Sequence, residues 1–141
     1  MPETVFWDTS AFVAVGNADD DLHEQAVRVS DTLARQKARI LTTSAVLTEV
    51  ANTFSRSGWR PIAHQLVESV RQSQVMGVAK VVHVDEALRE RGWALFVERP
   101  DKHWGLTDCI SFVVMQDQSI ARAFASDRHF EQAGFERLMQ P

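Results

Sequence analysis

Apolar and polar positions along this chain fall into blocks of two kinds, which predict strands and helices in alternation. Short runs rich in β-branched and aromatic residues are typical of buried strands, whereas longer segments with apolar residues three and four positions apart are typical of helices. The predicted strands are residues 4–7, 40–43, 81–84, 120–125 and 135–139. The predicted helices are residues 11–15, 22–38, 44–54, 61–75, 86–99 and 108–115.

Strands that alternate with helices are joined by crossover connections, which predict a mainly parallel sheet with helices on both faces. The predicted fold class is therefore α/β, arranged as a three-layer α/β/α sandwich. A length of 141 residues is typical of one domain, which we place at residues 1–141.

Composition and charge narrow the functional classes. Hydrophobic residues make up 45% of the chain, enough for a full core, and the formal net charge of −4 lacks the basic footprint of most nucleic-acid binders. Carboxylates that bind metal would make the formal net charge more negative, so this charge does not exclude a nucleic-acid substrate. A single cysteine, the lack of a basic leader segment and the lack of an apolar run of about 20 residues predict a cytoplasmic protein that does not span a membrane.

The most apolar of the predicted helices begins beside an acid. Thr107 is the expected N-cap, and the residues from Ile110 to Met115 make this helix apolar on most faces, so it should be buried. Asp108 would then lie at the rim of the core, where the free N–H groups of the helix N-terminus favour negative charge. A single first-turn Asp is usually structural, so Asp108 gains significance only beside other acids.

Three further acids follow the ends of predicted strands. Asp8 and Asp127 come after strands 4–7 and 120–125, and Glu49 lies in the first turns of the helix after strand 40–43. The carboxyl ends of parallel strands share one edge of a sheet, where ligands bind in open α/β folds. Crowded carboxylates repel each other unless they are protonated or bind cations, and oxygen ligands suit Mg²⁺ or Mn²⁺. Such a site predicts hydrolysis of a phosphodiester by a metal-activated water, whereas each acid taken alone can be a helix cap.

These acids lie within segments that resemble the PIN-domain family, and most closely the VapC-type toxins of prokaryotic toxin–antitoxin pairs. The segments occur in the order of the family and span nearly the whole chain. They are Val5 to Phe12, Leu47 to Asn52, Leu106 to Phe112, and Ser126 to Phe135. The resemblance implies a PIN-like fold and an endoribonuclease that depends on Mg²⁺, with Mn²⁺ as a substitute. It also implies an RNA substrate, a homodimer and a small inhibitory antitoxin. The catalytic and metal-binding residues would be Asp8, Glu49, Asp108 and Asp127.

One position departs from the pattern of the family, which often has Thr two residues before its last acid. That position is Ala125 here, so a hydroxyl group is missing unless Thr9 or Ser126 supplies it. Basic residues near the predicted loops are candidates to hold RNA phosphates. They are Arg56, Arg60, Lys102, His103 and Arg128.

Other functions compete with this interpretation. A catalytically weak or silent PIN-like RNA-binding module would keep the fold without cleavage. A phosphotransfer α/β domain is disfavoured, because Asp8 lacks a second Asp two residues later and no Lys follows a late strand. Cys109 is disfavoured as a nucleophile, because an apolar helix is where structural cysteines usually lie. For self-association, apolar residues beyond one helical stripe, such as Val27, Phe54 and Val67, offer a surface.

Overall fold

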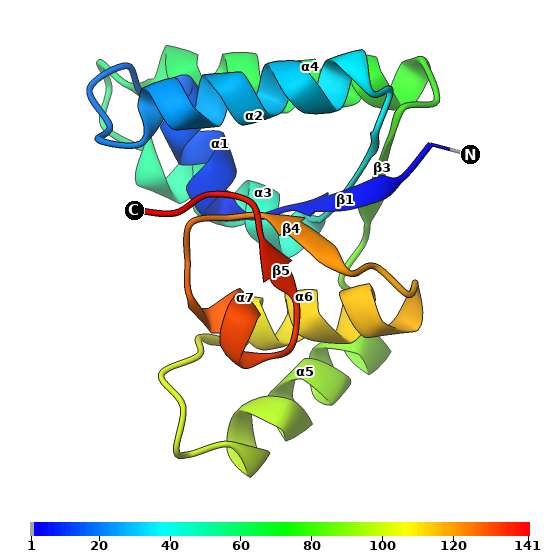
Figure 1. Cartoon of the computed structure of the whole chain (residues 1–141). Coiled ribbons are helices and arrows are strands. Elements are labelled where there is room, and N and C mark those ends of the chain that lie inside the picture. The colour runs from blue at the N-terminus through cyan, green and yellow to red at the C-terminus, as the bar shows by residue number, and fades with distance from the viewer. Residues whose placement is uncertain (1) are drawn as a thin grey trace.

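The computed structural model describes residues 2–141, which form one sheet between two layers of helices (Figure 1). The strands are β1 (Thr4–Trp7), β2 (Arg39–Thr43), β3 (Ala79–Val82), β4 (Arg122–Phe124) and β5 (Glu136–Arg137). Their order across the sheet is β3-β2-β1-β4-β5, and every pair is parallel. The predicted α/β class is confirmed, and the sheet is wholly parallel.

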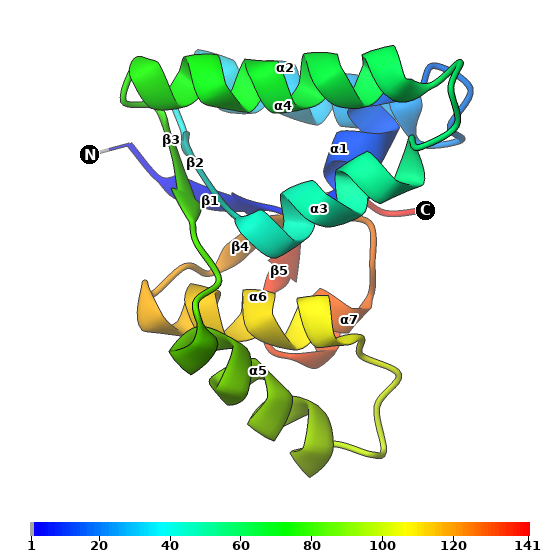
Figure 2. The same cartoon turned by 180° about the vertical axis from the view of Figure 1, so that it is seen from behind.

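Helices cover both faces of this sheet. α1 to α4 lie on one side and α5 to α7 on the other, as the two opposite views show (Figures 1 and 2). The helices are α1 (Thr9–Gly16), α2 (His23–Arg35), α3 (Ser44–Thr53), α4 (Arg60–Val75), α5 (Glu86–Glu98), α6 (Leu106–Asp117) and α7 (His129–Gln132). The predicted three-layer sandwich is therefore confirmed. Within residues 2–141, no helix combines the length and the apolar character that a membrane crossing requires.

Strand β1 is the central strand, and both of its faces are buried. Val5 packs with residues of α1 and α2, whereas Phe6 packs in the other cluster with residues of α6 and α7. Because successive side chains of a strand point to opposite faces, two apolar neighbours in a row mark a strand that is covered on both sides. The chain adds β2 and β3 on one flank of β1, and later β4 and β5 on the other. The strand order therefore reverses at β1 and β4, which is the usual ligand position in such folds.

Helix α6 is the most deeply buried helix of the described chain, as its apolar sequence predicts. The seven residues from Cys109 to Met115 are all buried. α5 approaches α6 closely at Gly92, where an added Cβ would lie 2.5 Å from Cγ1 of Ile110. The expected N-cap is wrong: Gly105 holds that position and Thr107 lies inside the helix. The reason is that the carboxylate of Asp108 accepts a hydrogen bond from the Gly105 N–H at 3.0 Å, which starts the helix earlier.

Other boundaries also differ from the expected ones. β3 begins two residues earlier than predicted, because Ala79 pairs with Ile40 of β2. Its last two predicted residues, His83 and Val84, lie outside the ladder, and the N–H of Val84 donates to the hydroxyl of Ser44 at 2.9 Å. β4 and β5 are shorter than predicted, and the turn expected between them contains the short helix α7.

Candidate functional site

One cavity of about 460 Å³ at the carboxyl edge of the sheet brings the predicted acids together. It receives side chains that are far apart in the sequence, from the ends of β1 and β4 and the first turns of α3 and α6. Its polar lining consists of Asp8, Thr9, Ser10, Asp20, Glu49, Asp108, Ser126 and Asp127. All four predicted acids and both auxiliary residues thus line the same space. Asp20 is a fifth acid there, and one of its carboxylate oxygens accepts a hydrogen bond from the Leu22 N–H.

Asp8 lies at the carboxyl end of β1 and is buried, with 5% of its surface exposed. It follows β1 and caps α1, and its Oδ2 accepts hydrogen bonds from the hydroxyl of Ser10 at 2.7 Å and from the Ser10 N–H at 3.3 Å. Burial raises the pKa of Asp8 to about 7, and the charge of Asp108 adds to the rise against the opposing Ser10 bonds. Asp8 is therefore a helix cap and a cavity acid at once, so the two interpretations of the sequence do not exclude each other.

Ser10 connects the ends of the two central strands. While its hydroxyl donates to Asp8, it accepts a hydrogen bond from the N–H of Ser126 at 3.1 Å, next to Asp127. Sequence analysis missed this residue. The available signal is the Asp-x-Ser spacing after β1, which is also typical of an ordinary cap and therefore does not single it out.

Glu49 is exposed and approaches the cavity from α3. Its Oε1 accepts a hydrogen bond from the hydroxyl of Thr9 at 2.8 Å, so α1 and α3 meet through this pair. Thr9, predicted as an auxiliary hydroxyl, thus holds one oxygen of Glu49. Ala125 is fully buried in the core, and the hydroxyl-bearing residues that line the cavity are Thr9, Ser10 and Ser126.

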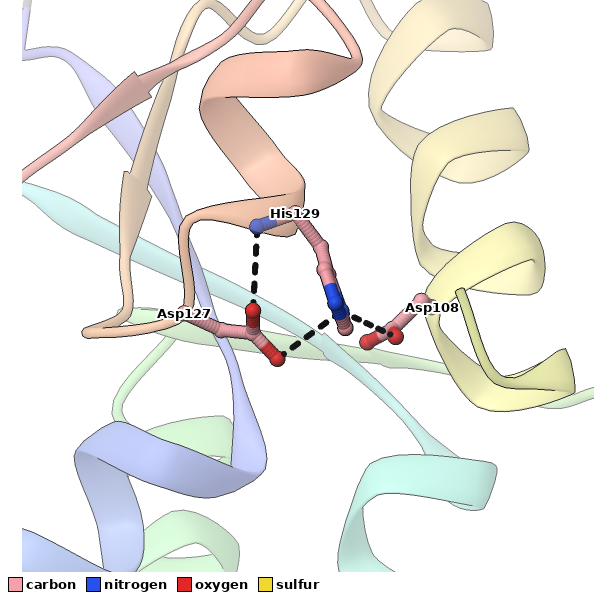
Figure 3. A group of neighbouring side chains, drawn as sticks. All are labelled: Asp108, Asp127 and His129. Atoms are coloured by element: carbon pink, nitrogen blue, oxygen red, sulfur yellow. Dashed lines mark hydrogen bonds and ion pairs between the residues drawn. The ribbon is translucent and has the colours of Figure 1, made fainter. Parts of the chain in front are cut away.

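Asp108, Asp127 and His129 form a tight group at one end of this edge (Figure 3). The Nδ1 atom of His129 lies 3.1 Å from Oδ2 of Asp108 and 3.1 Å from Oδ2 of Asp127, and the His129 N–H donates to Oδ1 of Asp127 at 2.9 Å. The potential ligand atoms of these three residues all lie within 4.8 Å of one another. His129 had no assigned role in the sequence analysis. The Asp-x-His spacing is its only local signal, because Asp108 is 21 residues away.

The electrostatics of the cavity favour bound cations. Partial burial raises the pKa of Asp108, and the nearby Asp127 raises it further, while the Gly105 N–H and His129 oppose the rise. Carboxylates that are costly to ionise together are stabilised when a cation is shared between them. The donor set is mostly carboxylate oxygen, which fits Mg²⁺ or Mn²⁺.

The predicted RNA-binding residues lie around the cavity and not in it. Arg128 is exposed beside Asp127 and lines a neighbouring cavity of about 420 Å³. Arg56 and Arg60 are exposed at the junction of α3 and α4, with Arg56 over the ring of Trp59. Lys102 lies half-buried in the loop before α6, and His103 is exposed there. Their role in RNA binding stays a prediction.

Two other expectations meet the structure directly. Cys109 is fully buried, and burial raises the pKa of its thiol to about 11, so the thiol stays protonated and is a poor nucleophile. Phe54, expected to help form a surface for self-association, is instead a core residue that is 2% exposed. That expectation is wrong, because the end of α3 packs inward.

Comparison with known proteins identifies relatives over nearly the whole chain. The PIN-domain family model matches residues 5–136. The chain is 30% identical over 131 residues to the protein of Mycobacterium tuberculosis named 23S rRNA-specific endonuclease VapC20, covering 93% of this chain and 95% of that protein.

Two solved structures are also similar. The crystal structure of Mycobacterium tuberculosis VapC20, described as a sarcin–ricin loop cleaving toxin, matches with a TM-score of 0.83 and 31% identity over 97% of this chain and 99% of that one. VapBC2 from Rickettsia felis, bound to a DNA fragment from its promoter, matches with a TM-score of 0.66 and 12% identity over 95% of this chain and 96% of that one. The second likeness supports the fold alone.

Proposed function

This chain belongs to the PIN-domain family, in its VapC-type branch, and from that premise we propose that the four acids of its cavity bind Mg²⁺ for the hydrolysis of RNA by this endoribonuclease. The observation that supports the proposal is the convergence of Asp8, Glu49, Asp108 and Asp127 on one cavity of about 460 Å³. The family match favours this nuclease over the phosphotransfer alternative.

The proposed mechanism divides the work between the metal and the side chains. A divalent cation bound by these acids would supply a nucleophilic water at neutral pH and stabilise the leaving oxygen of the phosphodiester. Asp8 and Asp108 would hold the cation, because both are partly or fully buried at the edge where their charge needs compensation. Hydrogen bonds from the hydroxyls of Thr9 and Ser10 orient the carboxylates of Glu49 and Asp8, which would then present their oxygens to the metal.

The proposed substrate is structured ribosomal RNA. This rests on VapC20, the relative whose name gives 23S rRNA as its target. Phosphates outside the acidic cavity would be contacted by Arg56, Arg60, Lys102 and Arg128. Cationic side chains inside the cavity would compete with the metal for the carboxylates. Exposed positions around a cavity suit this role, since they reach the backbone of an RNA loop without entering the site.

The test is cleavage of purified 23S rRNA and of total RNA in Mg²⁺, in Mn²⁺ and in EDTA, with cut sites mapped by primer extension. We expect cleavage that needs the divalent ion and is lost in Asp8→Asn and Asp108→Asn, which keep the side-chain shape but weaken the hold on a hard cation. Folded variants that cleave like the native protein would refute the acid assignments. RNA binding without cleavage under any condition would support the silent binding module instead.

We further propose that the protein is a cytoplasmic toxin, held inactive by a small antitoxin and assembled as a homodimer. The family resemblance supports both partners. For the dimer, α5 also exposes Trp93 and Phe96, whose rings stack with centroids 5.3 Å apart, next to Val97. A short open reading frame beside the gene and co-purification of its product test the antitoxin. Light scattering at high concentration tests the dimer, and a monomer there would contradict it.

A further inference from the structure

His129 contacts both acids of the Asp108–Asp127 pair with a single nitrogen atom. Its Nδ1 lies 3.1 Å from an oxygen of each, and the imidazole lies between the two carboxylates (Figure 3). The side chain is 23% exposed, and the carboxylates of Asp108 and Asp127 are 16% and 34% exposed. Two neighbouring carboxylates repel each other, so an imidazole nitrogen in contact with both holds together groups that would otherwise move apart.

The position of His129 is fixed by packing behind it. Phe130, the next residue, is fully buried, and its ring meets that of Phe112 edge to face with centroids 5.1 Å apart. Phe112 lies one turn after Asp108 on α6, so the contact that joins α6 and α7 also sets the distance between Asp108 and His129. A second link reinforces it, because the indole N–H of Trp104 donates to the side chain of Gln132 on α7 at 3.0 Å.

The two carboxylates differ in how many of their oxygens already contact a hydrogen-bond or ion-pair partner. Oδ2 of Asp108 accepts from His129 and from the Gly105 N–H, whereas no donor within residues 2–141 reaches its Oδ1. Oδ1 of Asp127 accepts a hydrogen bond from the His129 backbone N–H, and Oδ2 of Asp127 lies 3.1 Å from Nδ1 of the His129 ring as an ion-pair contact. His129 itself is not among the residues that line the acidic cavity. The imidazole therefore contacts two carboxylates that line the cavity without lining the cavity itself.

We propose that His129 is a positioning residue of the metal centre, whose Nδ1 contacts both Asp108 and Asp127 and holds the two carboxylates in position for a divalent cation. The inference rests on the proposed function, because it assumes that the cavity binds the metal. Partners that hydrogen-bond to metal ligands affect binding strongly, and their loss typically costs about 10-fold to 100-fold in metal affinity or activity. His129→Ala should weaken Mn²⁺ binding within that range.

The amide of Asn can place a nitrogen donor close to the position of Nδ1, whereas the longer Gln side chain places its amide further out. We therefore expect His129→Asn to bind Mn²⁺ within about 3-fold of the native protein, and His129→Gln to resemble His129→Ala. His64→Ala is the matched control, because His64 is exposed on α4 and lines no part of the site. If His129 were instead a metal ligand, Asn would not restore binding of Co²⁺, which prefers imidazole nitrogen over an amide.

The experiment measures Mn²⁺ dissociation constants by electron paramagnetic resonance and calorimetry, Co²⁺ dissociation constants by calorimetry, and metal-free melting temperatures, on the same preparations. Weakened Mn²⁺ binding in the Ala and Gln variants, restored by Asn, supports the proposal, as does cleavage by His129→Ala that recovers at high Mn²⁺. Equal affinity in all folded His129 variants overturns it, even if His129→Ala melts at a lower temperature. Should the Ala variant not fold, the Asn and Gln variants decide. A native protein that binds no Mn²⁺ overturns the proposed function, and this inference with it.

Discussion

Replacement of Asp8 by Asn should stabilise the metal-free protein while it removes metal binding and cleavage. Asp8 is buried, and its pKa is raised from 3.8 to about 7 in the folded state. Between these pH values the unfolded chain has released the proton and the folded chain still holds it, so the folded state binds more protons. The stability of the native protein therefore falls as the pH rises through this range.

The size of this effect follows from the two pKa values. At about 1.4 kcal/mol for each pH unit, the cost of Asp8 to folding is about 1.5 kcal/mol at pH 5 and about 4 kcal/mol at pH 7 and above. Asn has no charge to bury, and its carbonyl oxygen can still accept the hydrogen bonds of Ser10, so the cap of α1 is kept. In a domain of this size, the gain in free energy of unfolding of Asp8→Asn at pH 8 corresponds to a rise of about 10 °C in Tm.

The assay is urea unfolding of both proteins in EDTA between pH 4 and pH 8.5, followed by thermal melts with millimolar Mn²⁺. We expect the free energy of unfolding of Asp8→Asn to exceed that of the native protein by almost nothing at pH 4. This difference should grow until about pH 7 and then stay level. Asp85→Asn is the control, because it removes the same charge from the exposed cap of α5. A native protein as stable as Asp8→Asn at pH 8, or a difference independent of pH, would refute the reasoning from burial.

Further perturbations test the metal site, the packing of α5 and the loop that carries Asp127. Millimolar Mn²⁺ should raise the Tm of the native protein relative to EDTA, because a ligand that binds only the folded state stabilises it, and unchanged midpoints across the titration would contradict a metal site. Gly92→Ala should cost about 1–3 kcal/mol in urea unfolding, because its Cβ would overlap Ile110, whereas Gly58→Ala has no atom within 4 Å and should change little. Arg137→Gln should lower the free energy of unfolding by about 1.5–3 kcal/mol and lower cleavage. The reason is that the Arg137 guanidinium pairs with Glu131 and donates to the carbonyl of Ser126 at 2.6 Å. Native stability and cleavage in this variant would show that the contact is dispensable.

The sequence was sufficient for the architecture and for the convergence of the acids. Strand–helix alternation implies parallel strands, and parallel strands place their carboxyl ends at one edge, so the meeting of Asp8 with Asp127 follows from local patterns and one topological rule. The burial of α6 followed in the same way from its apolar residues.

The details that could not be predicted depend on contacts between distant residues. The Ser10 hydroxyl accepts from Ser126, 116 residues later, and nothing within either segment specifies the partner. His129 contacts Asp108 across 21 residues of sequence, and the packing of Phe112 against Phe130 brings the two helices together there. The predicted start of α6 is wrong for a local reason. Gly105 is the N-cap but has no side chain that could cap the helix, and the carboxylate of Asp108 accepts the hydrogen bond of the Gly105 N–H.

The pairing of β1 with β4 has a consequence for when the protein becomes active during its synthesis. Phe6 pairs with Ala123, and the Asp8 N–H donates to the carbonyl of Phe124 at 3.1 Å, so the first acid is aligned by a strand made more than a hundred residues later. Contacts this far apart in the chain form late, because a long loop must close before they stabilise anything. A growing chain that has not yet extended past residue 129 has neither Asp127 nor His129 in place. A complete site therefore forms only after almost the whole domain has been synthesised and folded.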